Sequence, residues 1–445
     1  MAKYKAYPEY KDSGVEWLGK IPTHWTTLAI KHVAQLNPSK SCISIEQMKG
    51  MCSFIPMEKL KFNSLSLDEI KYVPDVYNGY TYFENEDILI AKVTPCFENK
   101  NMVVAHDLHN GIGFGSSEIY VLRCNDTIKN DFLFYRLQED NFMFIAEGAM
   151  TGAGGLKRVP SEVLNNFKFG LPSKKEQSII VAFLNHETAK IDNLIEKQQQ
   201  LIELLKEKRQ AVISNVVNIR SSERKTKLKN LVNMQTGYPF PSAKFKFSPD
   251  NSIALLRGVN VGVDSIKWDD VVYWDVSALD RLNEYLLVAG DIVFGMDRPW
   301  ISSGTRVSEI KEQDLPCLLL QRVARIRSNI KSYQPFIKLC LSSNEFREYA
   351  EIDLTGVSVP HISPEQISNF YVKDIPFDEQ INLAKNALEK IRKIKIIQAM
   401  SEQTIQILQE RRTALISAAV TGKIDVRDWV APDTHDVEEP QEATA

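Results

Sequence analysis

The chain has 445 residues, of which 44% are apolar, and this is enough for about two to four domains, each with its own core. Its longest apolar runs, such as 178–184, are far shorter than the roughly 18 residues that a membrane span needs, and the N-terminal residues lack the apolar core of a signal peptide. A formal net charge of -3 argues against a protein that coats DNA by itself, because such proteins are usually strongly basic. We therefore expect a soluble cytoplasmic protein with no membrane segment.

The cysteines give no sign of a disulfide or a metal site. Neither a CxxC pair nor the spacing of metal ligands occurs among the six, which are Cys42, Cys52, Cys96, Cys124, Cys317 and Cys340. We expect reduced and mostly packed thiols, and no metal.

In chain order, the first predicted unit is a β-rich domain over residues 1–170. Short β-branched or aromatic runs, such as 87–90 and 119–122, are separated by Gly, Asn, Pro and Asp turns, and a short helix is expected from Asp131 to Asn141. A helical spacer, residues 171–220, follows. Within it, apolar residues recur every three or four positions from Lys174 to Val217 without Pro or Gly, which predicts one long helix.

The same order then repeats. Residues 221–374 again alternate short strands with turns, and a second spacer, residues 375–424, contains a long helix from about Asp378 to Val420 that Gly422 ends. The last segment, residues 425–445, has seven acids and one Arg, which predicts a disordered tail.

Each long helix has an apolar stripe that needs a partner. At about 1.5 Å per residue, forty-odd residues form a rod of roughly 60 to 65 Å, so an antiparallel pair of the two helices is expected. The polar patches at 198–200 and 401–403 interrupt the stripes, and they either set the register of the pair or simply face outward. The stripe residues that we expect to make partner contacts are Leu184, Ile191, Leu201, Leu205, Ile394, Ile397, Leu408 and Leu415.

The order repeats because the chain matches itself at a shift of about two hundred residues. At a shift of 203, the segments 166–167, 176–177 and 208–214 correspond to 369–370, 379–380 and 411–417. Further upstream the shift is 204, and 87–88, 95, 123 and 151–152 correspond to 291–292, 299, 327 and 355–356. A repeat this long is a domain plus a helix, so a pseudo-twofold molecule is expected.

No motif in the sequence predicts catalysis. The segment 14–21 matches a phosphate-binding loop except at Ile21, which replaces the hydroxyl that binds magnesium, and the glycines at 111–115 lack the surrounding strand and helix of a nucleotide site. No cluster of carboxylates and lysine typical of a nuclease occurs, and the seven histidines are scattered. We therefore predict no catalytic residue.

Loops on the repeated scaffold carry chemistry suited to DNA. Residues 151–158 join small residues, which permit close backbone approach, to two cations suited to phosphate or guanine, and residues 355–361 keep only the Thr-Gly pair. A plain surface turn is the alternative. The candidate DNA-binding residues are Lys92, Thr94, Asn99, Lys100, Thr151, Gly152, Lys157 and Arg158 in the first copy, and Arg298, Trp300, Ser302, Ser303, Thr355, Gly356, Ser358 and His361 in the second.

Four short motifs carry a family resemblance. They are WLGKIPTHW at 17–25, Leu171-Pro172 with Glu176-Gln177, Ile375-Pro376 with Glu379-Gln380, and AAVTGKID at 418–425. Through them the chain resembles, over nearly its full length, the specificity subunit of a type I restriction-modification enzyme. One departure is an extra residue between Pro172 and Glu176.

The resemblance implies an α+β fold with two β-rich target recognition domains, separated by a long antiparallel two-helix coiled coil. Each recognition domain would read one half of a bipartite site in double-stranded DNA. Two methyltransferase (modification) subunits would dock on the helical spacer, and restriction or translocase subunits would join for cleavage. Those partners would bind S-adenosylmethionine, ATP and magnesium, and this chain would bind no cofactor.

Two other classes of protein stay open. The first is a coiled-coil adaptor whose β-rich domains bind proteins and have no DNA specificity. The second is a nuclease or methyltransferase with an unfamiliar site, which DNA cleavage or methylation by the purified chain alone would establish.

Overall fold

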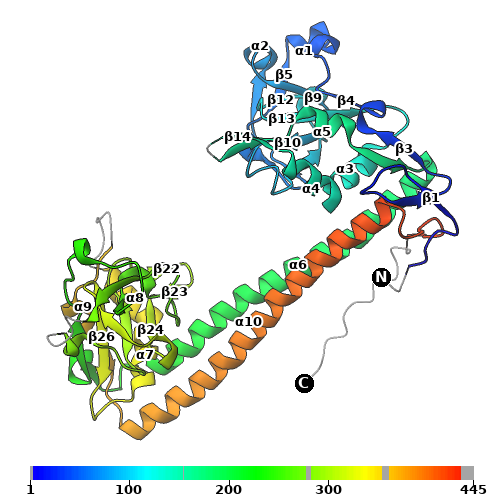
Figure 1. The fold of residues 1–445 in the computed structure, drawn as a ribbon. Helices are drawn as coiled ribbons and strands as arrows, with labels where there is room; N and C mark the ends of the chain where they lie inside the picture. The colour runs from blue at the N-terminus through cyan, green and yellow to red at the C-terminus, as the bar shows by residue number, and fades with distance from the viewer. Residues whose placement is uncertain (1–3, 154, 277–281, 353–359, 432–445) are drawn as a thin grey trace. The chain divides into compact units, whose positions relative to one another are not determined.

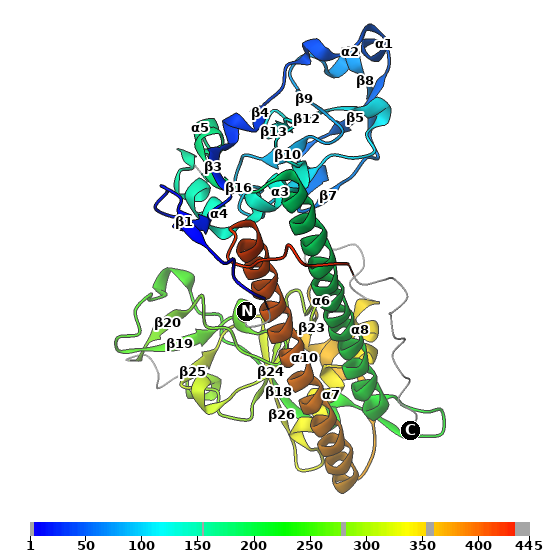
Figure 2. The same ribbon diagram turned by 90° about the vertical axis from the view of Figure 1, so that its right-hand side faces the viewer.

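The computed structural model describes residues 4–153, 155–276, 282–352 and 360–431 (Figures 1 and 2). The chain divides into two compact units: unit 1 comprises residues 1–197 and 404–445, and unit 2 comprises residues 198–403. Each unit contains one of the two β-rich domains, domain 1 in unit 1 and domain 2 in unit 2, together with part of each long helix. Among the described residues, no helix is long and apolar enough to cross a membrane.

The two long helices are α6, Lys174–Val217, and α10, Phe377–Val420, each of 44 residues. In unit 1, Leu184 near the start of α6 and Ala419 near the end of α10 belong to one hydrophobic core. In unit 2 the reverse holds, because Ile213 near the end of α6 shares a core with Ala387 near the start of α10. The helices are therefore paired antiparallel, as predicted (Figures 1 and 2).

Each domain is built on a central four-stranded sheet and a second sheet. The central order is β11-β10-β13-β4 in domain 1 and β24-β21-β26-β18 in domain 2, and the second sheets are β8-β5-β12-β9 and β20-β19-β25. The strands of domain 1 are β1 Tyr10–Asp12, β2 Lys20–Pro22, β3 Thr26–Ala29, β4 Ala34–Leu36, β5 Met51–Ile55, β6 Leu60–Lys61, β7 Ser64–Leu65, β8 Ile70–Tyr72, β9 Thr81–Glu84, β10 Ile88–Ala91, β11 Met102–Val104, β12 Ile112–Gly115, β13 Ile119–Cys124, β14 Thr151–Ala153, β15 Leu156–Arg158 and β16 Lys168–Leu171. Those of domain 2 are β17 Lys225–Lys227, β18 Val232–Thr236, β19 Ser252–Leu256, β20 Val272–Asp275, β21 Ile292–Gly295, β22 Trp300–Ile301, β23 Gly304–Thr305, β24 Val307–Glu309, β25 Cys317–Leu319, β26 Val323–Ser328 and β27 Tyr371–Lys373.

Short α-helices complete the domains. They are α1 Ile45–Met48, α2 Val73–Val76, α3 Asn130–Gln138, α4 Asp140–Gly148 and α5 Ser161–Asn166 in domain 1, and α7 Gln334–Leu341, α8 Asn344–Glu351 and α9 Pro364–Asn369 in domain 2. The single helix predicted from Asp131 to Asn141 is instead two helices, α3 and α4, that meet at Glu139. This residue has an extended backbone (ψ 151°), and its buried carboxylate lies 2.9 Å from the buried Arg136.

The alternating residues of the central strands face two different cores. In β10, Ile88 and Ile90 face the core that contains the helices, whereas Leu89 faces the core under the second sheet. In β21, Ile292 faces the helices and Val293 the second sheet. Because side chains alternate along a strand, a strand that is buried on both faces reads as a continuous apolar run.

The sequence repeat is also a repeat of contacts. Arg123 donates two hydrogen bonds to the buried Asp87, at 2.8 and 2.7 Å, and Arg327 pairs in the same way with the buried Asp291. These four residues correspond at the shift of 204. The predicted fold class, an α+β chain with two β-rich domains and two paired long helices in an internal repeat, is confirmed. The domain boundaries stay predictions.

Paired glutamines join each domain to the start of its helix. Gln177 accepts a hydrogen bond from the Lys129 N–H at 2.8 Å and donates to the Pro172 carbonyl at 2.9 Å. Gln380 repeats this with the Tyr333 N–H at 2.9 Å and the Ile375 carbonyl at 3.0 Å. Each glutamine is the fourth residue of its helix. The extra residue after Pro172 therefore lies before the helix and does not disturb this joint.

The first and last described segments meet in unit 1. Tyr7 and Trp25 both donate to the Glu176 carboxylate, at 2.7 and 3.0 Å, whereas the equivalent Glu379 in unit 2 is exposed. The Asp425 N–H donates to the Lys5 carbonyl at 2.7 Å.

The beginning of the predicted tail is packed. Val426 is buried in the core of unit 1, and the ring of Trp429 lies 5.7 Å from that of Phe183. Residues 425–429 are therefore anchored to the packed unit through Asp425, Val426 and Trp429. The last part of the predicted tail, 432–445, lies outside the described residues.

Candidate nucleic-acid interface

In domain 1, the two segments that hold the DNA-binding candidates are joined by their backbones. The Thr94 N–H donates to the Lys157 carbonyl at 3.0 Å, and the Val159 N–H donates to the Lys92 carbonyl at 2.9 Å. The Thr94 hydroxyl adds a bond to the Gly155 carbonyl at 2.6 Å. The segment after β10 and the hairpin β14–β15 therefore form one surface.

In domain 2, the equivalent atoms make the same two backbone bonds. The Arg298 N–H donates to the Pro360 carbonyl at 2.7 Å, and the Ile362 N–H donates to the Met296 carbonyl at 3.0 Å. The residues correspond to those of domain 1 at shifts of 204 and 203. The scaffold of the site is thus repeated while its side chains differ.

A third strand contributes one residue to each site. The Lys92 N–H donates to the Glu118 carbonyl at 3.0 Å, and the Met296 N–H donates to the Arg322 carbonyl, also at 3.0 Å. Glu118 and Arg322 stand at equivalent positions, just before β13 and β26. One site therefore has an acid where the other has a base.

Side chains in domain 1 form an ion pair around that acid. Arg158 donates from Nε and Nη2 to the Glu118 carboxylate at 2.9 and 2.8 Å, and Lys92 Nζ lies 3.9 Å from it. The hydrogen bonds from Arg158 hold the pKa of Glu118 below its ordinary value. Lys157 is exposed beside the pair, so the site has two positive charges in excess: three cations against one acid.

The hairpin β14–β15 exposes its backbone as well as its side chains. The described residues 151–153 and 155–158 are all exposed. Gly152 has a φ of +148°, and a Cβ there would lie 2.1 Å from the Leu156 carbonyl oxygen. Only glycine permits this close pairing of the two strands.

In domain 2, an acid orients the exposed arginine. Asp297 Oδ1 lies 2.6 Å from His361 Nδ1 and 3.4 Å from Arg322 Nη1. The Arg322 side chain is 57% exposed, and Arg298 is also exposed. Two guanidinium groups are therefore available on this surface.

An arginine-lined cavity of about 800 Å³ adjoins these residues. Its walls include Arg257, Arg298, Arg306 and Arg322, together with Phe240. Arg306 has a structural part, because it donates to the carbonyls of Val261 and Asp297 at 2.9 and 2.8 Å. Burial lowers the pKa of Arg306.

The other predicted residues lie apart from this junction. Lys100 Nζ donates to the Gln138 carbonyl at 2.8 Å at the end of α3, while Asn99 is exposed on the same turn. Ser302 and Ser303 form the exposed turn between β22 and β23, and the half-buried Trp300 lies 5.9 Å from the Arg347 guanidinium. Thr355, Gly356 and Ser358 lie outside the described residues.

Three residues of the junction are absent from the sequence-based candidates: Glu118, Asp297 and Arg322. Their partners are 25 to 64 residues away in the chain, so no local motif marks them. The internal repeat is the signal that could have found two of them, because Glu118 and Arg322 correspond at the shift of 204 that aligns the predicted loops.

The predicted spacer residues differ in exposure. Leu184, Ile191, Leu205 and Ile394 are buried; Leu201, Leu408 and Leu415 are half-buried; Ile397 is 43% exposed. Other exposed apolar residues include Leu194, the equivalent of Ile397 at the shift of 203, and the equivalent pair Leu204 and Ile407. Each unit thus exposes the same two positions on its helices.

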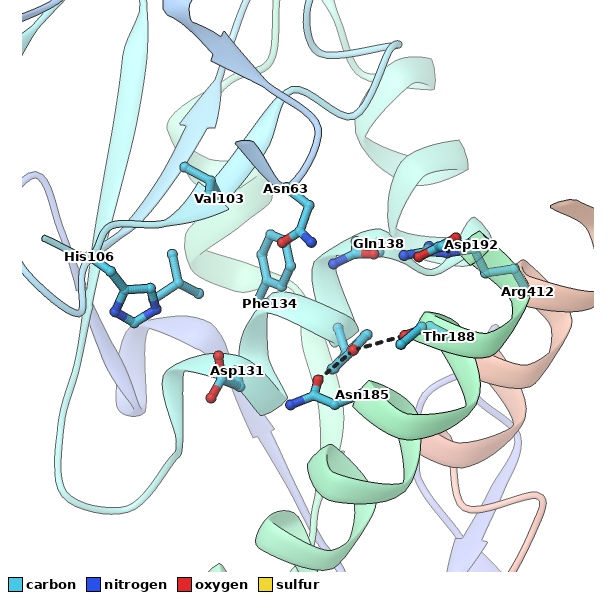
Figure 3. A pocket seen from close by; sticks show the side chains of 13 residues that line it. Asn63, Val103, His106, Asp131, Phe134, Gln138, Asn185, Thr188, Asp192 and Arg412 are labelled. Carbon is cyan, nitrogen blue, oxygen red and sulfur yellow. Dashed lines mark hydrogen bonds and ion pairs between the residues drawn. The ribbon is translucent and has the colours of Figure 1, made fainter. Parts of the chain in front are cut away.

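A polar cavity of about 340 Å³ lies in unit 1 between domain 1 and the helices (Figure 3). On one side, the Tyr135 hydroxyl donates to Asn185 Oδ1 at 2.7 Å. On another, Arg412 Nε donates to Asp192 Oδ1 at 2.9 Å, so that α10 is tied to α6. In the described part of the chain, no group of three His, Cys, Asp or Glu side chains is placed to hold a metal.

Comparison with known proteins agrees with the fold. The family described as type I restriction modification DNA specificity domain matches residues 22–204. The specificity subunit of the Escherichia coli type I restriction enzyme EcoAI is 27% identical, over 94% of this chain and 86% of its own length. The MjaVIII specificity subunit of Methanocaldococcus jannaschii is 24% identical, over 92% of this chain and 95% of its own.

Two solved structures share the architecture. A chain from a structural study of assembly and conformational transition in a type I R-M system aligns with a TM-score of 0.74 at 14% identity, covering 91% of this chain and 99% of that one. The HsdS subunit from Thermoanaerobacter tengcongensis aligns with a TM-score of 0.55 at 15% identity, covering 91% and 98%.

The fold and the repeated loop junction thus define a two-domain protein with the architecture of an HsdS subunit. The sequence relatives agree with this architecture, because residues 22–204 match the type I restriction modification DNA specificity domain and more than nine-tenths of the chain is similar to specificity subunits of type I restriction enzymes. These relatives are named as specificity subunits of type I restriction enzymes, and the matching domain is described as a DNA specificity domain.

Proposed function

We propose that this chain reads a bipartite site in double-stranded DNA, one half with each domain. The observation that carries the proposal is the loop junction, in which the same three backbone hydrogen bonds recur in both domains around unlike side chains. Two copies of one scaffold with different side chains are suited to two different base sequences. Both junctions have an excess of cations, which suits a surface that faces phosphate.

In domain 1, the proposed readers are Lys92, Thr94, Thr151, Gly152, Lys157 and Arg158, with Asn99 and Lys100 on the flanking turn. In domain 2 they are Arg298, Trp300, Ser302, Ser303 and His361, to which we add Arg322, and Thr355, Gly356 and Ser358 belong to the same proposal. The exposed guanidinium groups of Arg298 and Arg322 have the donor geometry that binds guanine O6 and N7.

We propose that the helices hold the two domains at a set separation and dock two methyltransferase subunits. Two like partners need two like surfaces, and the equivalent exposed pairs Leu194 with Ile407 in unit 1 and Leu204 with Ile397 in unit 2 supply them. Restriction or translocase subunits would join the same complex in the cytoplasm.

The cofactors belong to those partners in this proposal. S-adenosylmethionine would serve the methyltransferase subunits, and ATP and magnesium would serve the restriction subunits. This chain would hold none of them and would supply DNA contacts and partner surfaces.

The test is to purify the tagged chain from its own host and to map methylated adenines across the genome with and without the gene. We expect a methyltransferase to copurify, and methylation at one two-part motif to disappear when the gene is deleted. A pull-down with partners but an unchanged methylome would contradict the proposal and favour a coiled-coil adaptor without DNA specificity.

A further inference from the structure

A single carboxylate of domain 2 is surrounded by cations from three helices. Asp264 Oδ2 accepts hydrogen bonds from Arg209 Nη2 of α6 at 2.7 Å and from Lys395 Nζ of α10 at 2.9 Å. Asp264 Oδ1 lies 3.2 Å from Lys338 Nζ of α7. All four residues belong to unit 2. The acid therefore ties domain 2 to both long helices at one point.

The geometry at Asp264 favours this point of attachment. Its side chain is only 17% exposed, and its backbone lies in the left-handed region, with a φ of +57°. A hydrogen bond from the Asp264 N–H to the Val307 carbonyl, 3.1 Å, holds the loop on β24. Charged hydrogen bonds of this length inside a protein are stronger than neutral ones and restrict orientation.

Unit 1 neutralises the equivalent arginine in a different way. Arg412 and Asp192 correspond to Arg209 and Lys395 at the shift of 203, and they pair with each other across the two helices (Figure 3). Domain 1 contributes the Phe62 ring, 5.1 Å from the Arg412 guanidinium. Among the described residues, no acid of domain 1 pairs with Arg412. The acid thus lies on a helix in unit 1 and on the domain in unit 2.

We propose that Asp264 is a positioning residue that fixes domain 2 on the helices and thereby limits the gap between half-sites that the chain accepts. This inference rests on the proposed function. One base pair changes the position of a half-site by about 3.4 Å and its direction by about 35°. A domain tied to both long helices by hydrogen bonds of 2.7 and 2.9 Å, with the same carboxylate held within the domain by Lys338, resists such a displacement.

The experiment uses the full chain coexpressed with its methyltransferase subunits and a DNA library in which the gap is one base pair shorter, unchanged or one longer. The wild-type complex should methylate one gap. Asp264→Ala should raise methylation at the other two gaps, relative to the preferred one, by at least about 10-fold, and the bases read in each half should not change.

A second variant separates attachment from neutralisation. In Asp264→Ala combined with Lys395→Asp, the new acid neutralises Arg209 from α10, as Asp192 neutralises Arg412 in unit 1. We expect this variant to recover thermal stability and to keep the relaxed gap. If either variant still methylated only the preferred gap, the inference would be overturned. If neither folds, Lys395→Ala removes one of the three contacts and should relax the gap by a smaller factor, and a strict gap there would overturn it.

A matched control is Asp250→Ala, which removes the same charge from an exposed position in domain 2 and should keep the strict gap. The wild-type result distinguishes a failure of the proposed function from a failure of the inference about Asp264. If the wild-type complex methylates no two-part site, the proposed function fails. If it does, and the Asp264 variants stay strict, only the inference about Asp264 fails.

Discussion

Glu118 and Arg322 occupy the same backbone position in the two domains and carry opposite charges. The acid in domain 1 binds Arg158, so that guanidinium is held in a fixed direction with fewer free donors. The arginine in domain 2 is held loosely by Asp297 and stays 57% exposed. One substitution between copies of a repeat thus changes which groups can face a ligand.

Arg322→Ala should weaken binding to the recognised site by about 1 to 3 kcal/mol, or roughly 5- to 150-fold, because a guanidinium that contacts a base is lost. The loss should be largest at one base pair of one half-site. Methylation of a library with each position varied measures it. Arg220→Ala, an exposed arginine outside the interface, is the control, and an equal loss in both variants would count against base contact.

The ion pairs of Asp264 predict how the stability of the protein depends on pH in the acid range. Burial raises its pKa, but the attraction of Lys338, Arg209 and Lys395 outweighs burial and holds the pKa well below the ordinary 3.8. A depressed folded-state pKa stabilises the protein above the unfolded value, and this stabilisation is lost as pH falls through the folded value.

Asp264→Asn should therefore lower the free energy of unfolding by about 3 kcal/mol at pH 5 to 7, and the difference from wild type should shrink below about pH 4. Urea unfolding at a series of pH values tests this. A difference that stays constant down to pH 3 would show that the carboxylate charge is not the cause.

The start of each long helix is fixed by side chains that satisfy backbone groups. Gln177→Ala and Gln380→Ala should each lower the free energy of unfolding by about 3 kcal/mol, because buried N–H and C=O groups lose their partners. The two glutamates that precede these glutamines should differ in their effect on the free energy of unfolding. Glu176→Ala removes a buried acceptor of several hydrogen bonds, whereas Glu379→Ala, at an exposed position, should change stability by less than about 0.5 kcal/mol. Equal effects of the two glutamate variants in urea unfolding would contradict this reading.

We expect the length of the two long helices to determine the gap between the half-sites. Seven residues inserted in both α6 and α10, by duplicating 198–204 and 401–407, add two turns and about 10 Å. The preferred gap should then grow by about three base pairs, at about 3.4 Å each. The same insertion in α6 alone should disrupt the pair and abolish methylation. An unchanged preferred gap in the double insertion would show that helix length does not determine it.

The elements differ in how far local sequence determined them. The bounds of α6 were predictable because its 44 residues contain no Pro or Gly and keep one apolar stripe. The break between α3 and α4 could not be predicted, because the sequence of residues 138–140 is compatible with a helix. At this break Arg136 pairs locally with Glu139 and also makes a tertiary contact, since it donates to the Val420 carbonyl at 3.3 Å. The loop junction was predicted only in part for the same reason, since Arg322 and Asp297 meet through folding.

At the scale of the whole molecule, charge is unevenly distributed. The formal net charge is -3, although both loop junctions have an excess of cations. The isolated chain should therefore bind DNA weakly and with a shallow dependence on salt, with fewer than about four counterions released.

Adding the methyltransferase subunits should steepen the dependence of log K on log salt, because they contribute further phosphate contacts. Fluorescence anisotropy between 50 and 200 mM salt measures both slopes. If the chain alone already shows the slope of the complex, the partners do not supply the missing contacts.

The contact of the first and last described segments in unit 1 has a consequence for synthesis on the ribosome. Unit 2 is one continuous stretch, 198–403, whereas unit 1 also needs residues from 404 onward. Domains tend to fold as their residues emerge, at about 5 to 20 residues per second. The core of unit 1 therefore stays incomplete for roughly 10 to 50 s, with the apolar side of α6 exposed. It is completed only when Ile416, Val420 and Val426 have been synthesised. Domain 2, although translated later, can be finished first.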